Sequence, residues 1–159
     1  MSTSNSRGID FLIAYRVIKL LTTTFENQDA YKLGIIDKDG NVLMKYNTLK
    51  KDSEKRAYTM LHRFVFNLKR ILAKIGIKGA LGSFAVAAAL LFKENKQFAK
   101  HKLIIESSVI NFLKKTGQYE TMLNEHRIIP EIKETPYMNC FGVDVFEKNG
   151  KLISEFEYD

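Results

Sequence analysis

The stretch DSEKRAYTMLHRFVFNLKRILAKI, residues 52–75, carries the clearest structural signal in the sequence. Its apolar residues recur every three or four positions, as on the buried face of an α-helix. They are Ala57, Leu61, Phe64, Val65, Leu68, Ile71, Leu72 and Ile75. Asp52 or Ser53 can cap the first exposed amides, and glycines at positions 76 and 79 end the pattern. The spacing therefore predicts one continuous helix over residues 52–75.

The opposite face of this predicted helix is basic along its length. Residues seven positions apart lie close to two helical turns apart and share one side. Two such triplets are present: Arg56, Arg63 and Arg70, and Lys55, His62 and Lys69. No acidic residue occurs between Glu54 and Glu94, so ion pairs within the helix cannot neutralise this face. We expect a binding face for DNA or an acidic protein surface, formed by Lys55, Arg56, Arg63, Lys69, Arg70 and Lys74.

A row of cations on a rigid helix suits a phosphate backbone, because the planar fork of arginine can hold two phosphate oxygens at once. Contacts with phosphates position a protein without reading bases, so the expected binding is independent of sequence. A face that only keeps the helix solvated is the alternative. The chain has no zinc-finger spacing, and a helix-turn-helix over residues 69–92 would place small apolar side chains where base contacts are needed.

Charge is unevenly distributed along the 159-residue chain, whose net charge is +7. Residues 55–117 carry 13 basic and 2 acidic side chains, whereas residues 118–159 carry 4 basic and 9 acidic ones. This pattern suggests a basic face for a polyanion and an acidic end for a neighbouring subunit. Neutralisation of the two ends within one fold is the alternative.

The length and composition predict a single folded domain over residues 8–159, preceded by a flexible, polar leader at residues 1–7. Residues 8–21, GIDFLIAYRVIKLL, are apolar nearly all round, apart from Asp10, Arg16 and Lys19. A helix with so little polar surface is typically buried between layers of a fold. We therefore expect residues 8–21 to form a buried helix.

Two β-hairpins are predicted from favoured turn pairs between apolar segments. Asp39-Gly40 lies within residues 31–46, and Asn149-Gly150 lies within residues 141–158. A tight hairpin turn needs positive φ, which glycine adopts without steric cost. Helices are predicted between the two hairpins. The predicted fold class is α+β, mainly helical with two β-hairpins at about residues 31–46 and 141–158.

Residues 80–92, ALGSFAVAAALLF, predict a second apolar helix. Gly79, Ser83 and Ala87 are four apart, and a face of small residues lets another helix pack closely. We predict that these three residues form a helix-packing face. The segment is shorter than the roughly 20 residues that span a bilayer, so a core position is favoured over membrane association.

The sequence offers no recognisable catalytic, cofactor or metal site. It has no glycine-rich phosphate loop ending in Lys-Ser or Lys-Thr. His62, His101 and His126 share no ligand spacing, and Cys140 is the single cysteine. We therefore expect a non-enzymatic protein without catalytic residues, metal or cofactor.

Three segments, GIDFLIAYRVIKLL, AYKLGIIDKDG and LHRFVFNLKRILAKI, resemble small proteins of tailed bacteriophages, particularly T4-like and marine ones. The resemblance covers roughly residues 8–92 and assigns no role to particular positions. It implies a protein made in the cytoplasm of the bacterial host and carried in the virion. A place in the head or neck, close to packaged DNA, fits this origin.

These observations lead to one principal functional prediction and one alternative. The principal prediction is a bacteriophage structural protein whose basic helix faces DNA or an acidic neighbouring subunit. Its partners would be other virion proteins, with self-association through exposed strand edges. The alternative is a non-virion accessory or regulatory protein that binds nucleic acid during infection.

Overall fold

The computed structural model describes residues 3–75, 80–117, 119 and 132–158. Within these residues four long helices, three short helices and one three-stranded antiparallel sheet confirm the mainly helical α+β class. The long helices are α1 (Thr3–Thr22), α4 (Met60–Ile75), α5 (Ala80–Glu94) and α7 (Lys102–Lys115). The short helices are α2 (Asp29–Lys32), α3 (Asp52–Ala57) and α6 (Lys96–Ala99). The strands are β1 (Met138–Cys140), β2 (Val143–Lys148) and β3 (Lys151–Ser154).

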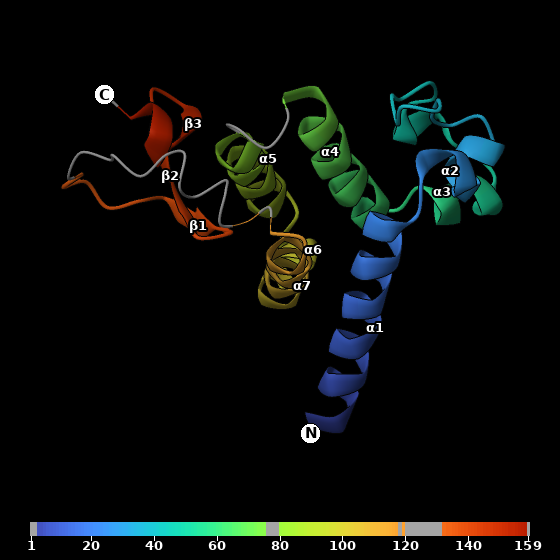
Figure 1. The fold of residues 1–159 in the computed structure, drawn as a ribbon, viewed down its shortest axis with the longest axis horizontal. Helices are drawn as coiled ribbons and strands as arrows, with labels where there is room; N and C mark the ends of the chain where they lie inside the picture. The colour runs from blue at the N-terminus through green and yellow to red at the C-terminus, as the bar shows by residue number, and fades with distance from the viewer. Residues whose placement is uncertain (1–2, 76–79, 118, 120–131, 159) are drawn as a thin grey trace.

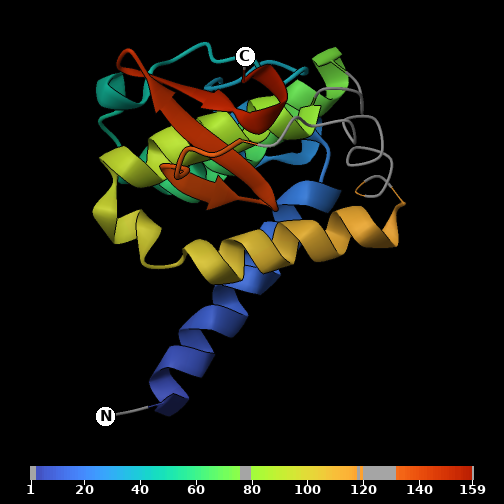
Figure 2. The ribbon, with the colours of Figure 1, turned by 90° about the vertical axis from the view of Figure 1, so that its left-hand side faces the viewer.

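The elements follow one another across the molecule (Figure 1). The sheet lies at one end, next to α5, and α4 lies between α5 and a lobe that contains α2 and α3. Residues 25–58 make up this lobe, which also includes two 3-10 turns, η1 (Phe25–Asn27) and η2 (Tyr46–Thr48). Helix α1 contacts α4 and α7, and its N-terminal half extends beyond the other elements (Figure 2).

The core is built around Phe64 on the apolar face of α4, which is fully buried. Its ring centroid lies 5.1 Å from that of Phe84 on α5 and 5.5 Å from that of Phe98 on α6. Phe141, between β1 and β2, closes the cluster at 4.8 Å from Phe84. The predicted apolar stripe of residues 57–75 therefore holds α4 against α5 and the sheet.

A small residue, Gly82, allows α5 to approach the sheet closely. Gly82 lies against Ser154 at the end of β3, and Ala85 and Ala89 are fully buried. Ser83 and Ala87, which were expected to form the packing face, are only half-buried, and Gly79 lies outside the described residues. The close approach is at Gly82, where an added Cβ would lie 2.9 Å from the Phe156 ring and 3.1 Å from the Ser154 hydroxyl oxygen.

The C-terminal hairpin is confirmed and belongs to a larger sheet. β2 and β3 pair in antiparallel register around Asn149 and Gly150, whose φ values of 53° and 80° suit a tight turn. β1 pairs with the other edge of β2 through a second tight turn at Phe141-Gly142, also with positive φ. The carboxylate of Glu106 on α7 accepts a 2.9 Å hydrogen bond from the Phe141 amide and fixes this turn.

The hairpin predicted at residues 31–46 is wrong in extent, because the described structure has only one isolated bridge there, between Ile36 and Val42. The Asp37 carboxylate organises the turn by accepting hydrogen bonds from the amides of Asp39 and Asn41, both at 2.9 Å. These bonds to the charged form lower the pKa of Asp37. Helix α2 occupies the start of the expected first strand, so a longer ladder cannot form.

Helix α1 differs from the expectation in two respects. It begins at Thr3, so residues 3–7 of the predicted leader are helical. Its apolar residues are not sandwiched between layers: Phe11 is 77% exposed and Tyr15 is 56% exposed. Only Val17, Leu20 and Leu21, near its C-terminal end, are buried. The C-terminal half of α1 therefore anchors the helix, and its N-terminal half contributes little to the core.

We predict that Gly40→Ala destabilises the protein more than Gly150→Ala. Both glycines have φ near +80°, where any other residue costs roughly 1–2 kcal/mol. A Cβ at position 40 would also collide with the ring of Phe25, whereas no atom lies within 4 Å of one at position 150. Urea unfolding measures both variants, and equal losses of stability would contradict the role of the Gly40–Phe25 contact.

Candidate anion-binding cleft

The basic helix predicted over residues 52–75 is two helices in the structure. Helix α3 ends at Ala57 and α4 starts at Met60. Between them Tyr58 is buried, with its ring centroid 6.2 Å from that of Phe66, and its backbone is not helical (φ −141°, ψ 58°). Because the chain turns at this point, Lys55 and Arg56 do not continue the row of cations on α4.

Thr59 and His62 form a reciprocal cap at the start of α4. The Thr59 hydroxyl lies 2.7 Å from His62 Nδ1, and the Thr59 amide donates to the same nitrogen at 3.2 Å. The His62 amide in turn donates to the Thr59 hydroxyl oxygen at 3.4 Å. This is the arrangement of a capping box, with histidine in the position usually held by glutamate or glutamine. Nδ1 is the acceptor, so the ring proton of the neutral imidazole lies on Nε2.

Lys69, predicted to bind a partner, instead holds the C-terminal end of α1. Its ammonium donates to the carbonyl oxygens of Leu20, at 3.1 Å, and Thr23. The same ammonium lies 4.5 Å from the centroid of the Phe25 ring. Partial burial lowers the pKa of Lys69. Because the last carbonyls of a helix attract cations, this contact stabilises the end of α1.

Arg63 and Arg70 also make contacts within the protein. Arg70 donates a 2.7 Å hydrogen bond to the carbonyl oxygen of Gly40, and Arg63 stacks 4.2 Å from the centroid of the Tyr46 ring. Both arginines therefore hold the lobe of residues 25–58 against α4. The expectation that Arg63, Lys69 and Arg70 bind a partner is corrected on this point, because all three are half-buried and make contacts within the protein.

The remaining cations of the predicted face behave differently. Lys55 and Arg56 are exposed on α3, and neither makes an ion pair within the described residues. The backbone of Lys74 belongs to the last turn of α4, and its side chain lies outside the described part of the chain. Among the predicted residues whose side chains the structure describes, Arg56 lines a cleft with residues of α1 and the lobe.

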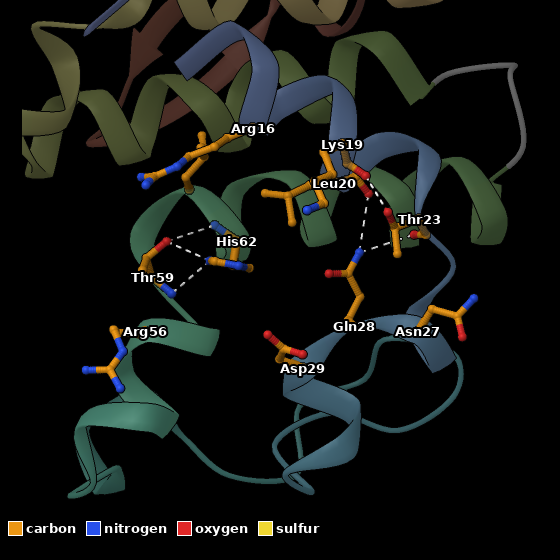
Figure 3. Close-up of a pocket in the computed structure, with 11 residues that line it drawn as sticks. Arg16, Lys19, Leu20, Thr23, Asn27, Gln28, Asp29, Arg56, Thr59 and His62 are labelled. Carbon is orange, nitrogen blue, oxygen red and sulfur yellow. Dashed lines mark hydrogen bonds between the residues drawn. The ribbon is translucent and has the colours of Figure 1, made fainter. Parts of the chain in front are cut away.

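This cleft has a volume of about 450 Å³ and lies where α1, the lobe and the start of α4 meet. Arg16 and Lys19 reach it from α1, and Arg56 reaches it from α3. Figure 3 shows Arg16, the Thr59–His62 cap and Arg56 following one another along one side of the opening. Asp29 supplies the one carboxylate in the lining, so the cleft is cationic even when His62 is neutral.

The pKa of His62 reports the electrostatics of the cleft. Burial of the imidazole lowers this pKa, and the positive charge of Arg16 lowers it further. The carboxylate of Asp29 acts in the opposite direction. These effects show that charges from α1 and α2 both reach the ring. Burial and Arg16 outweigh Asp29, so the neutral form of His62 is favoured.

Sequence reasoning missed Arg16 and Lys19, which appeared only as interruptions of an apolar helix. They are three positions apart, which places them on the same side of α1. This spacing is the sequence signal that could have identified them as a pair of cations. Phe66 gave a second signal, since it lies outside the predicted apolar stripe and yet is fully buried against the lobe. A large aromatic residue on a charged helical face indicated that another segment covers that face.

The thiol of Cys140 is buried, and burial raises its pKa to about 12, which keeps it protonated at neutral pH. No group of three or more metal-ligating side chains gathers in the part of the chain that the structure describes. Among the described helices, none is both long enough and apolar enough to span a membrane.

Comparisons of the chain with protein-family models, curated protein sequences and solved structures found no match.

We predict that protonation of His62 destabilises the fold, because Nδ1 must stay unprotonated to accept from Thr59. The pKa of His62 is lower in the folded protein than its ordinary value of 6.5, so the unfolded chain takes up the proton first. The stability that this cap contributes is present above pH 6.5. It is lost as the pH falls from 6.5 through the lowered pKa.

The measurement is the free energy of unfolding of the wild type and of His62→Gln between about pH 5 and 8. Glutamine preserves the capping box but does not titrate, so the difference between the two curves isolates His62 from the other histidines. We expect the free energy of unfolding of the wild type, relative to that of His62→Gln, to fall toward low pH. Parallel curves would contradict the prediction.

Proposed function

We propose that this protein is a non-catalytic nucleic-acid-binding protein that holds phosphates with the cations around the cleft. The observation that carries the proposal is the convergence of Arg16, Lys19 and Arg56 on one opening. None of these three side chains is engaged in an ion pair within the described residues. By contrast, Arg63, Lys69 and Arg70 are occupied within the protein.

The geometry of the cleft supports a defined phosphate-binding site more than diffuse attraction by a cationic surface. Two arginines from separate helices face one opening, and each guanidinium can donate two parallel hydrogen bonds to one phosphate. Arg16 lies on a helix whose C-terminal end is held by Lys69, so the backbone from which its side chain extends is held in place. Contacts of this kind bind the backbone and leave the bases unread, so binding is independent of base sequence.

The test compares two triple variants that remove the same number of charges. Arg16→Ala/Lys19→Ala/Arg56→Ala removes the cations of the cleft. Lys96→Ala/Lys100→Ala/Lys115→Ala removes exposed cations from α6, from the residue that follows it and from α7. Fluorescence anisotropy with labelled single-stranded and double-stranded DNA measures the affinity. With three cations available for phosphates, the wild type should show a negative salt slope of log K on duplex DNA, no steeper than about −3.

We expect the cleft variant to lose at least about tenfold in affinity for every DNA sequence, and to show a shallower salt slope. The α6–α7 variant should bind nearly as tightly as the wild type. Equal losses in both variants would mean that overall charge, and not the cleft, governs binding. Unchanged affinity in the cleft variant would contradict the proposal.

The biological setting we propose is the bacteriophage virion, in the head or neck near packaged DNA, with other virion proteins as neighbours. This part rests on the resemblance of residues 8–92 to small proteins of tailed phages. An acidic neighbouring subunit would engage the same cations. A non-virion accessory protein that binds nucleic acid during infection is the second candidate, because the geometry of the cleft serves either setting.

Mass spectrometry of purified particles, with copy number per particle, separates the two settings. A virion component should be present at a copy number that matches the symmetry of the head or neck. If particles lack the chain while infected cells contain it bound to nucleic acid, the accessory role replaces the virion role.

A further inference from the structure

The cleft has the size and the walls of a site for a discrete ligand. Its volume of about 450 Å³ falls within the range of pockets that hold small molecules. This is more space than one phosphate group occupies, so room remains for an attached sugar or base. Leu20 and Leu61 supply apolar contacts in the lining, and Asn27 supplies an amide.

The charges of the cleft are separated between two walls. Arg16, His62 and Arg56 lie along one side, and Figure 3 shows Asp29 and Gln28 facing them from the lobe. A phosphate placed on the first side is attracted by two guanidinium groups. The carboxylate of Asp29 repels a phosphate from the opposite wall and can accept hydrogen bonds from the hydroxyl groups of a sugar. The two guanidinium groups therefore favour the first side for a phosphate, and Lys19, which Figure 3 shows beside Leu20, adds a cation elsewhere in the lining.

His62 adds a donor to the phosphate side. Both the amide and the hydroxyl of Thr59 lie within hydrogen-bonding distance of Nδ1, so Nε2 carries the ring proton and can donate it in a hydrogen bond to an anion. The charged groups that line the cleft around this ring are Arg16 and Lys19 on α1, Asp29 on α2 and Arg56 on α3. An anion bound among them would offset the repulsion between the imidazolium and Arg16, and so would raise the pKa of His62.

We propose that the cleft is a seat for one phosphate group of a nucleotide unit, held by Arg16 and Arg56 with His62 as a neutral donor. The inference rests on the proposed function, since it assigns the group of the nucleic acid that enters the cleft. A free nucleotide and a strand of DNA carry the same chemistry. Binding at this seat differs from contact with scattered surface cations because the cations come from two helices and line one cleft together with His62.

The experiment uses NMR signals of the His62 ring and of the arginine side chains in the full chain. Three ligands are titrated separately: inorganic phosphate, a nucleoside 5′-monophosphate and a single-stranded oligonucleotide. Arg56→Ala tests the seat. Lys55→Ala is the matched control, because Lys55 is an exposed neighbour on the same helix that does not line the cleft.

We expect the nucleoside monophosphate to shift the His62 signals and to raise the pKa of this ring. Arg56→Ala should weaken the affinity for the monophosphate at least about tenfold, and Lys55→Ala should leave this affinity unchanged. Inorganic phosphate should compete for the same signals with lower affinity, because it lacks the contacts of the sugar and base. If Arg56→Ala binds the monophosphate as tightly as the wild type does, the proposal of a phosphate seat is overturned.

The remaining outcomes separate this inference from the proposed function. If the oligonucleotide binds while none of the three ligands perturbs His62, the seat is wrong and the nucleic-acid function stands. If the monophosphate occupies the cleft and no oligonucleotide binds, the seat stands with a free nucleotide as its ligand, and the proposed function is wrong. If the His62 shift saturates with the oligonucleotide and the monophosphate displaces the oligonucleotide, both the seat and the proposed function are supported.

Discussion

The ammonium of Lys69 at the C-terminal end of α1 is the contact on which the arrangement of the cleft depends. It donates to the carbonyl oxygens of Leu20 and Thr23, which the helix itself leaves without partners. The amide of Gln28 reaches the same two oxygens, at 3.5 and 3.2 Å. Two donors from distant parts of the chain thus fasten the end of α1 to α4 and to the lobe. Arg16 and Lys19 lie one to two turns before this point, and the contact brings them to the cleft.

Helix α4 is the element that joins the two halves of the molecule. Its apolar face packs on α5 through Phe64, and its opposite face carries Phe66, Arg70 and Lys69 into contact with the lobe. A half-buried cation loses hydration, and the lowered pKa of Lys69 reflects this loss. The helix dipole and the ring of Phe25 offset it. Basic residues of α4 thus hold the lobe in place, and among the described side chains the cations of α1 and α3 line the cleft.

The sequence predicted the helical period and one turn well because both signals are local. The apolar spacing of residues 57–75 placed the core face of α4, and Asn149-Gly150 marked the hairpin of β2 and β3. The break at Tyr58 and Thr59 also had a local signal, because Thr59 lies three residues before His62, at the spacing of a helix cap. The longer apolar pattern outweighed this signal. Expecting one helix led directly to expecting one continuous basic face.

The cleft could not be predicted from local patterns, since its cations come from residues 40 positions apart that meet only through tertiary contacts. Periodicity assigned Arg63, Lys69 and Arg70 to solvent because it cannot show which segment covers a polar face. Burial of α1 was overestimated for a related reason: composition says that Phe11 and Tyr15 are apolar, but not whether another layer reaches them. Counting charges identified the basic part of the chain. It did not show which of the basic side chains make contacts within the protein.

The most direct test of the central claim is a distance distribution between α1 and α3, measured by pulsed electron spin resonance. Spin labels at Phe11→Cys and Lys55→Cys occupy exposed positions, and the buried Cys140, with its pKa raised to about 12, should not compete for the label. If Lys69 fixes α1, the distribution is narrow with Lys69 present and broad with Lys69→Met in the same labelled protein. An equally narrow distribution in both proteins would contradict the account.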